Sequence, residues 1–178
     1  MDATQKAIEE LLQNYRIGET TDELAADNSS DLRLIHNHMA RQAKRSLHIV
    51  SRRLDKELFD NKPFISAVTQ LVRRSKYSFI QILVQDASPA VKNGHRLITL
   101  SQQLTSYIKI KQLHNDYKEY TRAFIVVDEK AYILREAGDR FEATINYNAP
   151  LAARELVRFF NDAWEISEPD PQLRRLHI

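Results

Sequence analysis

Arginine and carboxylate side chains stand directly after the buried strands that the sequence predicts. Arg52 and Arg53 follow the apolar stretch 46–51, SLHIVS, and Asp86 follows the next such stretch, FIQILV. Pockets in open α/β sheets form outside the ends of strands, and guanidinium groups bind phosphate through paired hydrogen bonds. The sequence therefore predicts a phosphate-binding site near Arg52 and Arg53. The alternative is a surface ion pair of Arg52 with Asp55 or Asp86.

Two histidines and two further arginines complete the set of candidate ligand-binding residues. His95 and Arg96 stand where a helix is predicted to begin, a position at which backbone N–H groups bind anions. His114 lies on a polar loop and could act as a displaced nucleophile or base, although a solvated loop histidine is the commoner situation. Arg122 directly precedes the apolar run 123–127.

Metal and cofactor chemistry is not indicated. The chain has no Cys, so it has neither a thiol nucleophile nor a disulfide framework. His36 and His38 lie about 200° apart around a predicted helix and make a poor metal pair. His48 is predicted to be a packed strand residue. We therefore expect no metal site, no cofactor and no catalytic residue.

Apolar periodicity places these residues on helices and strands. Gln85 to Asn93 is expected to be a loop. The predicted order argues for an α/β fold, a mixed sheet with helices packed on both faces. Helices are expected over 3–15, 30–45, 61–74, 96–104 and 148–164, and strands over 46–51, 79–84, 107–111, 123–127, 131–134 and 141–147.

Charge divides the chain unevenly. The first 31 residues carry eight acids against two bases, and the rest carries 16 acids against 24 bases. This division predicts a basic body with an acidic extension that could cover it, with ordinary solvated surface as the alternative. We expect an N-terminal helix and acidic linker over 1–30, a domain over 31–166 and a tail over 167–178. Apolar runs of about five residues are far short of the roughly 20 that span a bilayer, so a cytoplasmic location is the default expectation.

The stretch 120–136, YTRAFIVVDEKAYILRE, has the pattern of a buried strand, a turn and a second strand. In sequence it resembles the signature hairpin of the phospholipase D superfamily, H-x-K-x-x-x-x-D, in its single-copy bacterial type. Asp128 stands at the Asp place of that motif, but Thr121 stands at the His place and Ala123 at the Lys place. The segment 141–164 resembles the closing segment of the same family, with its F-x-x-x-W spacing.

The resemblance implies a phospholipase D-like fold and a lost chemistry. In the family a His attacks phosphorus, a second His protonates the leaving group, and a Lys steadies the charge on the phosphoryl oxygens. With Thr121 and Ala123 in those places, we expect a catalytically inactive domain, a pseudoenzyme, that binds or scaffolds a protein or a phosphate-bearing ligand. The alternatives are a divergent phosphodiesterase or nuclease that uses His114, and sequence-independent nucleic-acid binding through the basic body.

A homodimer is implied as well. Single-copy members of the family are similar in obtaining the second motif from another chain, so the resemblance implies that two hairpin sites face each other across a two-fold axis. The amphipathic first helix and the tail 173–178, with Leu173 and Leu176 on one face, could pack across such an interface or back onto the domain.

Overall fold

The computed structural model describes residues 3–174, which form a seven-stranded sheet with helices on both faces. The predicted α/β fold is confirmed. In chain order the elements are α1 (Ala3–Leu12), β1 (Leu24–Ala26), α2 (Ser29–Gln42), β2 (Ser46–Ser51), α3 (Lys56–Phe59), α4 (Lys62–Arg74), β3 (Phe79–Val84), α5 (Ser88–Lys92), α6 (Arg96–Gln103), β4 (Ile108–Gln112), η1 (Asn115–Tyr117), β5 (Ala123–Val127), β6 (Ala131–Arg135), β7 (Ala143–Asn146), α7 (Pro150–Ile166) and η2 (Pro171–Arg174).

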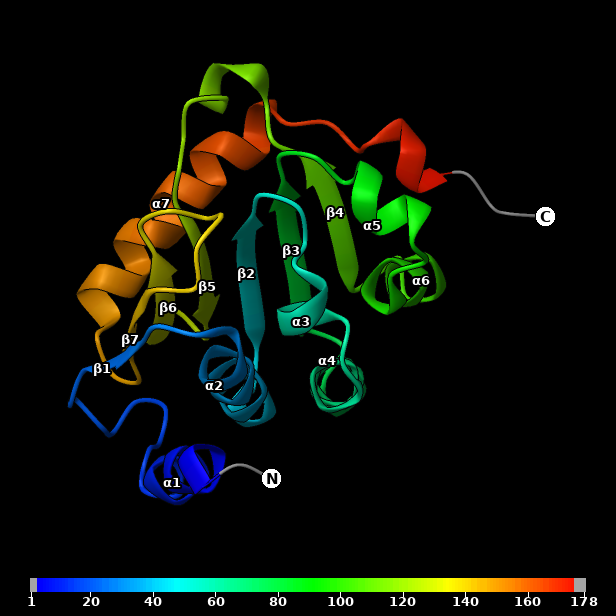
Figure 1. Cartoon of the computed structure of the whole chain (residues 1–178). Helices are drawn as coiled ribbons and strands as arrows, with labels where there is room; N and C mark the ends of the chain where they lie inside the picture. Colours follow the sequence, from blue (N-terminus) through cyan, green and yellow to red (C-terminus); the bar gives the residue numbers. More distant parts are fainter. Residues whose placement is uncertain (1–2, 175–178) are drawn as a thin grey trace.

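The sheet has the strand order β1-β7-β6-β5-β2-β3-β4, with two parallel and four antiparallel pairings. Strands β2, β3 and β4 run parallel, and their arrowheads point toward the top of Figure 1. Helical segments connect them, as parallel strands require. The remaining strands pair antiparallel, with β5 against β2. The sheet therefore has one edge where β2, β3 and β4 all end, and an opposite edge where they begin.

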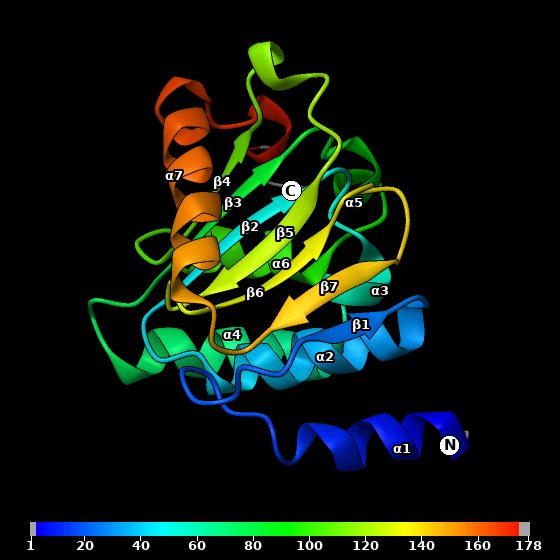
Figure 2. The ribbon, with the colours of Figure 1, turned by 90° about the vertical axis from the view of Figure 1, so that its left-hand side faces the viewer.

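Alternating side chains of the central strands divide between two cores. Ile49 and Ile82 pack with α2, α4 and α6 on one face, whereas Val50 and Leu83 pack with α7 on the other. Figures 1 and 2 show α7 across the sheet from α2 and α4, with α1 lying outside α2. Because both faces are covered, strand β2 is buried at every position, including His48. This double burial explains the nearly continuous apolar runs in the sequence.

Capping residues fix the starts of helices α2 and α4. The side chain of Asn61 accepts a hydrogen bond from Phe64 N at the start of α4, and Pro63 stands in the first turn. At the start of α2 the cap is Asn28, which accepts from Asp31 N. Both helices therefore begin where an amide side chain satisfies a free backbone N–H group.

Two segments that the sequence predicts as irregular contain regular structure. The expected loop 85–93 contains helix α5, and the expected acidic linker contains strand β1, which pairs antiparallel with β7. A three-residue strand and a five-residue helix are too short to show a period in the sequence. The domain boundary that we placed near residue 30 stays a prediction.

The C-terminal segment lies against the end of the sheet. Gln112 of β4 forms an isolated bridge with Glu168, and the side chain of Gln102 donates to the carbonyl of Leu173. Leu176, which was expected to share a face with Leu173, lies outside the described residues. Among residues 3–174, no helix has the length and apolar character that a membrane crossing requires.

Candidate functional site

The candidate site lies at the edge where β2, β3 and β4 end, which we call the C-terminal edge. The hairpin also meets this edge, since β5 begins there beside the end of β2 and β6 ends there, with Ala123 opposite Arg135. Segments far apart in the sequence are thus brought to one place. This edge is the position expected for a ligand site in an open α/β sheet.

Of the two positions that the resemblance assigns to catalysis, Ala123 is buried at this edge and Thr121 is exposed. Ala123 is 1% exposed, and a Cβ atom built on Gly138 would meet the Ala123 Cβ at 3.2 Å and the Thr121 carbonyl oxygen at 3.1 Å. Gly138 N donates to that carbonyl at 2.7 Å. The Thr121 hydroxyl donates to the carbonyl of Glu136 at 3.2 Å. The backbone that follows β6 therefore occupies the space that a longer side chain at position 123 would need.

Asp128 lies at the opposite edge of the sheet, where its hydrogen bonds stabilise the fold. Its carboxylate accepts hydrogen bonds from the backbone N–H groups of Lys44, Arg45 and Ser46, at 2.8, 2.7 and 2.9 Å. Asp128 and Glu129 both have left-handed backbone angles, φ 53° and 55°, as a two-residue hairpin turn requires. Asp tolerates that conformation better than most residues. Asp128 thus joins the hairpin turn to the start of β2.

A buried arginine that the sequence did not single out stands beside Ala123. The side chain of Arg135 is 4% exposed and donates to the Asp55 carboxylate at 2.5 Å; the Asp55 side chain is 24% exposed. Arg135 also donates to the carbonyl of Arg140 at 3.0 Å, and its guanidinium lies 6.0 Å from the ring centre of Phe141. The two charged partners are 80 residues apart, so no local pattern could pair them.

Arg52 and Arg53 do come together in a pocket of about 300 Å³ at the C-terminal edge. Asp55, Gly138 and Asp139 complete its lining. The Arg52 guanidinium lies 3.5 Å from the Asp139 carboxylate, with side chains 51% and 60% exposed. The alternative that we considered for Arg52, a surface ion pair, is therefore confirmed in kind but not in partner, because Asp55 pairs with Arg135 and Asp86 accepts a hydrogen bond from Ser88.

Two of the predicted ligand-binding residues are directed elsewhere. Arg122 alternates with Thr121 and Ala123, so its side chain lies on the α7 face of the sheet, where it pairs with Glu136 at 2.6 Å. Asp86 accepts a hydrogen bond from Ser88 N at the start of α5. Hydrogen bonds from the Ser88 side chain and backbone lower the pKa of Asp86. Neither residue lines the pocket that holds Arg52.

His95 and Arg96 serve the start of α6. His95 Nδ1 accepts from Leu97 N at 3.2 Å, and Arg96 lies 3.6 Å from Asp60. His95 is buried, and burial lowers its pKa. It lines a neighbouring pocket of about 190 Å³, whose lining also includes Arg53.

His114 lies in a different pocket from the arginines. Its Nδ1 accepts from Asp116 N at 3.2 Å, and it lines a hollow of about 450 Å³ with residues of β4 and of the C-terminal segment. That hollow and the pocket of Arg52 have no residue in common. His114 is therefore not placed to serve a phosphate held by Arg52 and Arg53.

Of the three remaining histidines, His36 and His48 are buried and His38 is half-buried, and in each case burial lowers the pKa. Burial lowers the pKa of His36 to about 3 and those of His38 and His48 to about 4. His48 packs edge-on against Phe79 and Phe160. Within residues 3–174 the structure gathers no group of three or more His, Asp or Glu that could hold a metal ion. These histidines are packing residues.

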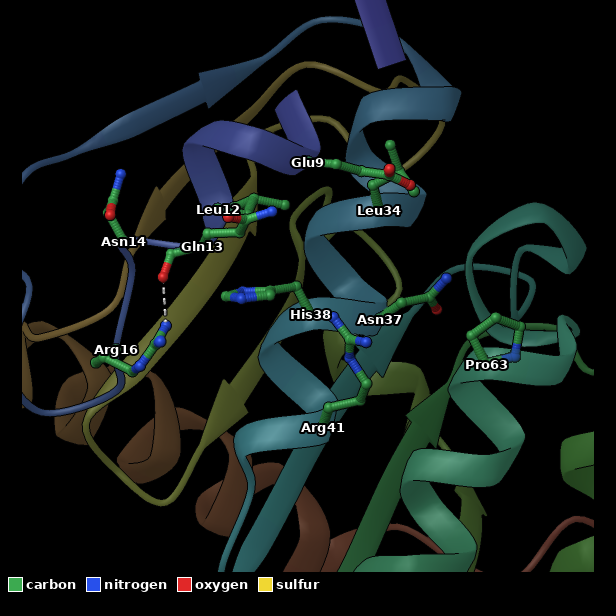
Figure 3. A pocket seen from close by; sticks show the side chains of 10 residues that line it. All are labelled: Glu9, Leu12, Gln13, Asn14, Arg16, Leu34, Asn37, His38, Arg41 and Pro63. Carbon is green, nitrogen blue, oxygen red and sulfur yellow. Dashed lines mark hydrogen bonds between the residues drawn. The ribbon is translucent and has the colours of Figure 1, made fainter. Parts of the chain in front are cut away.

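A pocket of about 730 Å³ lies between α1 and α2, away from the predicted residues. Figure 3 shows the Arg41 side chain between those of His38 and Asn37. His38 Nδ1 is hydrogen bonded to the Tyr147 hydroxyl at 2.8 Å, and Arg16 is held by the carbonyl of Gln13. None of the residues that line it lines the pocket of Arg52. The helix that forms one wall belongs to the acidic extension.

Residues 28–176 match a family described as a domain of unknown function, DUF7931. The chain belongs to this family. No curated protein matches it. Its fold is similar to that of Nuc from Salmonella typhimurium, a phospholipase D family member, with a TM-score of 0.58 and 13% identity over 85% of this chain and 97% of that one. NucT from Helicobacter pylori is similar too, with a TM-score of 0.60 and 12% identity over 84% and 99%.

Another similar structure is that of TrmBL2, an archaeal chromatin protein described as showing a novel mode of DNA binding. Its TM-score is 0.61 at 17% identity, over 94% of the DUF7931 chain, which spans 63% of TrmBL2. At these identities the likeness concerns the fold. The DUF7931 chain therefore has a phospholipase D-like α/β fold.

Proposed function

We propose that this DUF7931 domain is a catalytically inactive phospholipase D-like module that binds a phosphate-bearing ligand at the C-terminal edge. The observation that carries the proposal is the combination of two features. Ala123 is buried against the backbone at Gly138 and the exposed Thr121 hydroxyl is hydrogen bonded to the carbonyl of Glu136, while Arg52 and Arg53 line an open pocket that includes Gly138. The edge thus keeps groups that bind phosphate and lacks the side chains that would attack it.

The electrostatics of the pocket favour a single phosphate group. Asp55 also lines it, but Arg135 pairs with that carboxylate from the buried side. Asp139 holds Arg52 only through an exposed contact, and exposed ion pairs contribute about 0–1 kcal/mol. A phosphate can therefore replace Asp139 at little cost and receive paired hydrogen bonds from Arg52.

Binding is tested by titrating inorganic phosphate into the full chain and following backbone amide signals by NMR. We expect shifts that centre on Arg52, Arg53 and Gly138, and a loss of affinity of about tenfold or more in the variant Arg52→Gln with Arg53→Gln. The matched control, Arg73→Gln with Lys76→Gln, removes the same charge at the opposite edge. Equal losses in both variants would contradict the proposal.

The absence of catalysis has its own test. Hydrolysis of a chromogenic phosphodiester and of plasmid DNA, with and without divalent metals, should stay at the level of a blank. Turnover that disappears in His114→Ala would overturn the inactive assignment and favour the rival, a divergent phosphodiesterase.

The homodimer stays a prediction that rests on the resemblance. The chain has a mass of 20.8 kDa, so light scattering separates a monomer from a dimer directly. A mass that stays at the monomer value over a concentration series would contradict the expected pairing of two hairpin sites.

A further inference from the structure

We propose that the edge opposite the C-terminal edge binds the phosphate backbone of nucleic acids without reading base sequence. We call this surface the basic edge. It consists of five exposed cationic side chains and one exposed aromatic ring, and it shares no residue with the phosphate pocket proposed above. Its members are Lys44, Arg45, Arg73, Arg74, Lys76 and Tyr77.

The basic edge is formed by the two chain segments that follow α2 and α4, and hydrogen bonds join these segments to each other. The Arg74 guanidinium donates to the carbonyl of Ala43 at 3.1 Å, and Phe79 N donates to the carbonyl of Arg45 at 3.1 Å. Helices α2 and α4 both run toward the left of Figure 2, where β2 and β3 begin. The loops that leave these two helices therefore lie side by side and present their cations together.

These cations have no acidic partner among the described residues, since none of the five takes part in an ion pair there. Neither 39–48 nor 70–81 contains an acid. The Asp128 carboxylate is adjacent, but it accepts three backbone N–H groups. The surface is thus left with a positive charge that solvent ions must balance, which is the electrostatic footprint of a polyanion site.

Helix stabilisation accounts for only part of this charge. Arg73 and Arg74 stand in the last turn of α4, where cations complement the helix dipole. Lys44, Arg45 and Lys76 lie two or three residues beyond the ends of α2 and α4, so they extend the positive charge past the last turns to which the dipole rule applies. The cluster is therefore larger than helix stabilisation alone requires.

Tyr77 favours nucleic acid over an anionic membrane surface. It is 72% exposed, and Lys76 Nζ lies 5.1 Å from its ring centre. Proteins that bind single strands combine cations with aromatic rings on which bases stack. Binding in a membrane interface instead uses an extended apolar face, and the other exposed large apolar residues of the described chain, Leu11, Leu151 and Ile166, are not part of this surface.

The test is fluorescence anisotropy of the full chain with a short random-sequence single strand of DNA, repeated over a salt series. We expect log affinity to fall linearly with log salt, by about 0.7 for each phosphate neutralised. The variant Arg73→Gln with Lys76→Gln should reduce the magnitude of this slope by about 1–2 and weaken binding equally for unrelated sequences. The control Arg52→Gln with Arg53→Gln removes the same charge and should leave the slope unchanged.

Each outcome decides the matter. Equal slope changes in both variants, or an affinity for the DNA strand that is independent of salt, would overturn the proposal. So would binding to phosphatidylserine vesicles without binding to DNA. Loss of phosphate binding in the Arg52 and Arg53 variant with DNA binding intact would support the basic edge as a separate site. If the phosphate titration shows no binding at Arg52 and Arg53, the prediction for DNA binding at the basic edge is unchanged. The two proposals can therefore be contradicted independently.

Discussion

Cations lie at both edges of the sheet, but only those at the C-terminal edge are paired. Every ion pair among residues 3–174 joins groups in segments that follow β2, β3 or β4 or flank the hairpin at that edge. At the basic edge the cations face solvent. The difference teaches that the cations nearest the hairpin are the ones with acidic partners, whereas the exposed cations without an ion pair gather at the opposite edge.

The pairing changes what a ligand must do at each edge. At the C-terminal edge a phosphate has to displace the carboxylate of Asp139 from Arg52. At the basic edge a nucleic acid displaces only diffuse counterions, which gives binding that is weak at high salt. The first edge therefore suits one compact anion, and the second suits a long polyanion.

The largest effect should come from the buried pair at the C-terminal edge. Asp55→Ala leaves the Arg135 cation buried without its partner, and we expect the free energy of unfolding to fall by about 4 kcal/mol. Asp139→Ala, which leaves exposed Arg52 unpaired, should cost about 0–1 kcal/mol. Urea unfolding of both variants gives the difference. Similar costs for the two would mean that burial does not distinguish these pairs.

Acid should weaken the fold on which both edges depend, through His48. Burial lowers its pKa to about 4, whereas the unfolded chain has an ordinary His pKa near 6.5. The unfolded state therefore binds the extra proton first, and stability is lost as pH falls from about 6.5 to about 4, by up to about 3 kcal/mol for this group. Urea unfolding over that range should show a flatter pH dependence for His48→Leu than for the wild type. Parallel curves would contradict the assignment.

Substitutions of Asp128 test the basic edge by removing a negative charge beside it, whereas the variants above remove positive charges from it. Asp128→Ala removes the acceptor for three N–H groups, and we expect a loss of about 2 kcal/mol in the free energy of unfolding. Asp128→Asn keeps one carbonyl acceptor and tolerates the left-handed backbone, so its loss should be smaller, while its DNA binding should tighten because a negative charge is gone. Thermal unfolding and anisotropy measure the two effects. Weaker DNA binding by folded Asp128→Asn would count against the basic edge.

The smallest effect is expected at Glu136. Its pair with Arg122 is short but exposed, so Glu136→Gln should change the free energy of unfolding by less than about 1 kcal/mol. DNA binding should stay unchanged, because Arg122 lies at the other edge. A large rise in DNA affinity would show that freeing a cation at the C-terminal edge is enough, and the contrast between the edges would fail.

Local signals were sufficient for most of the fold. The stretches SLHIVS and FIQILV are strands over the predicted bounds, and Asn61 caps the helix it was expected to open. Asp128 is at the hairpin turn, as predicted. These features depend on residues a few positions apart, where apolar period, caps and turn residues act directly.

The site depends on partners that no local signal connects. Arg135 is the last residue of β6, and nothing near it in the sequence indicates Asp55 as its partner. The basic edge joins two helix ends about 30 residues apart. Arg122 was expected with Arg52, but strand alternation places it on the other face. The tertiary fold decides which charges meet, so the grouping of the candidate residues could not be predicted from the sequence.

Strand β1 has a consequence for the behaviour of the chain in concentrated solution. It covers the outer side of β7 with three residues from the acidic extension. Without it, β7 would present unpaired backbone groups that can recruit the same strand of another molecule. β1 is itself too short to offer much of a template, and acids surround it in the sequence. We therefore expect the extension to limit strand pairing between molecules.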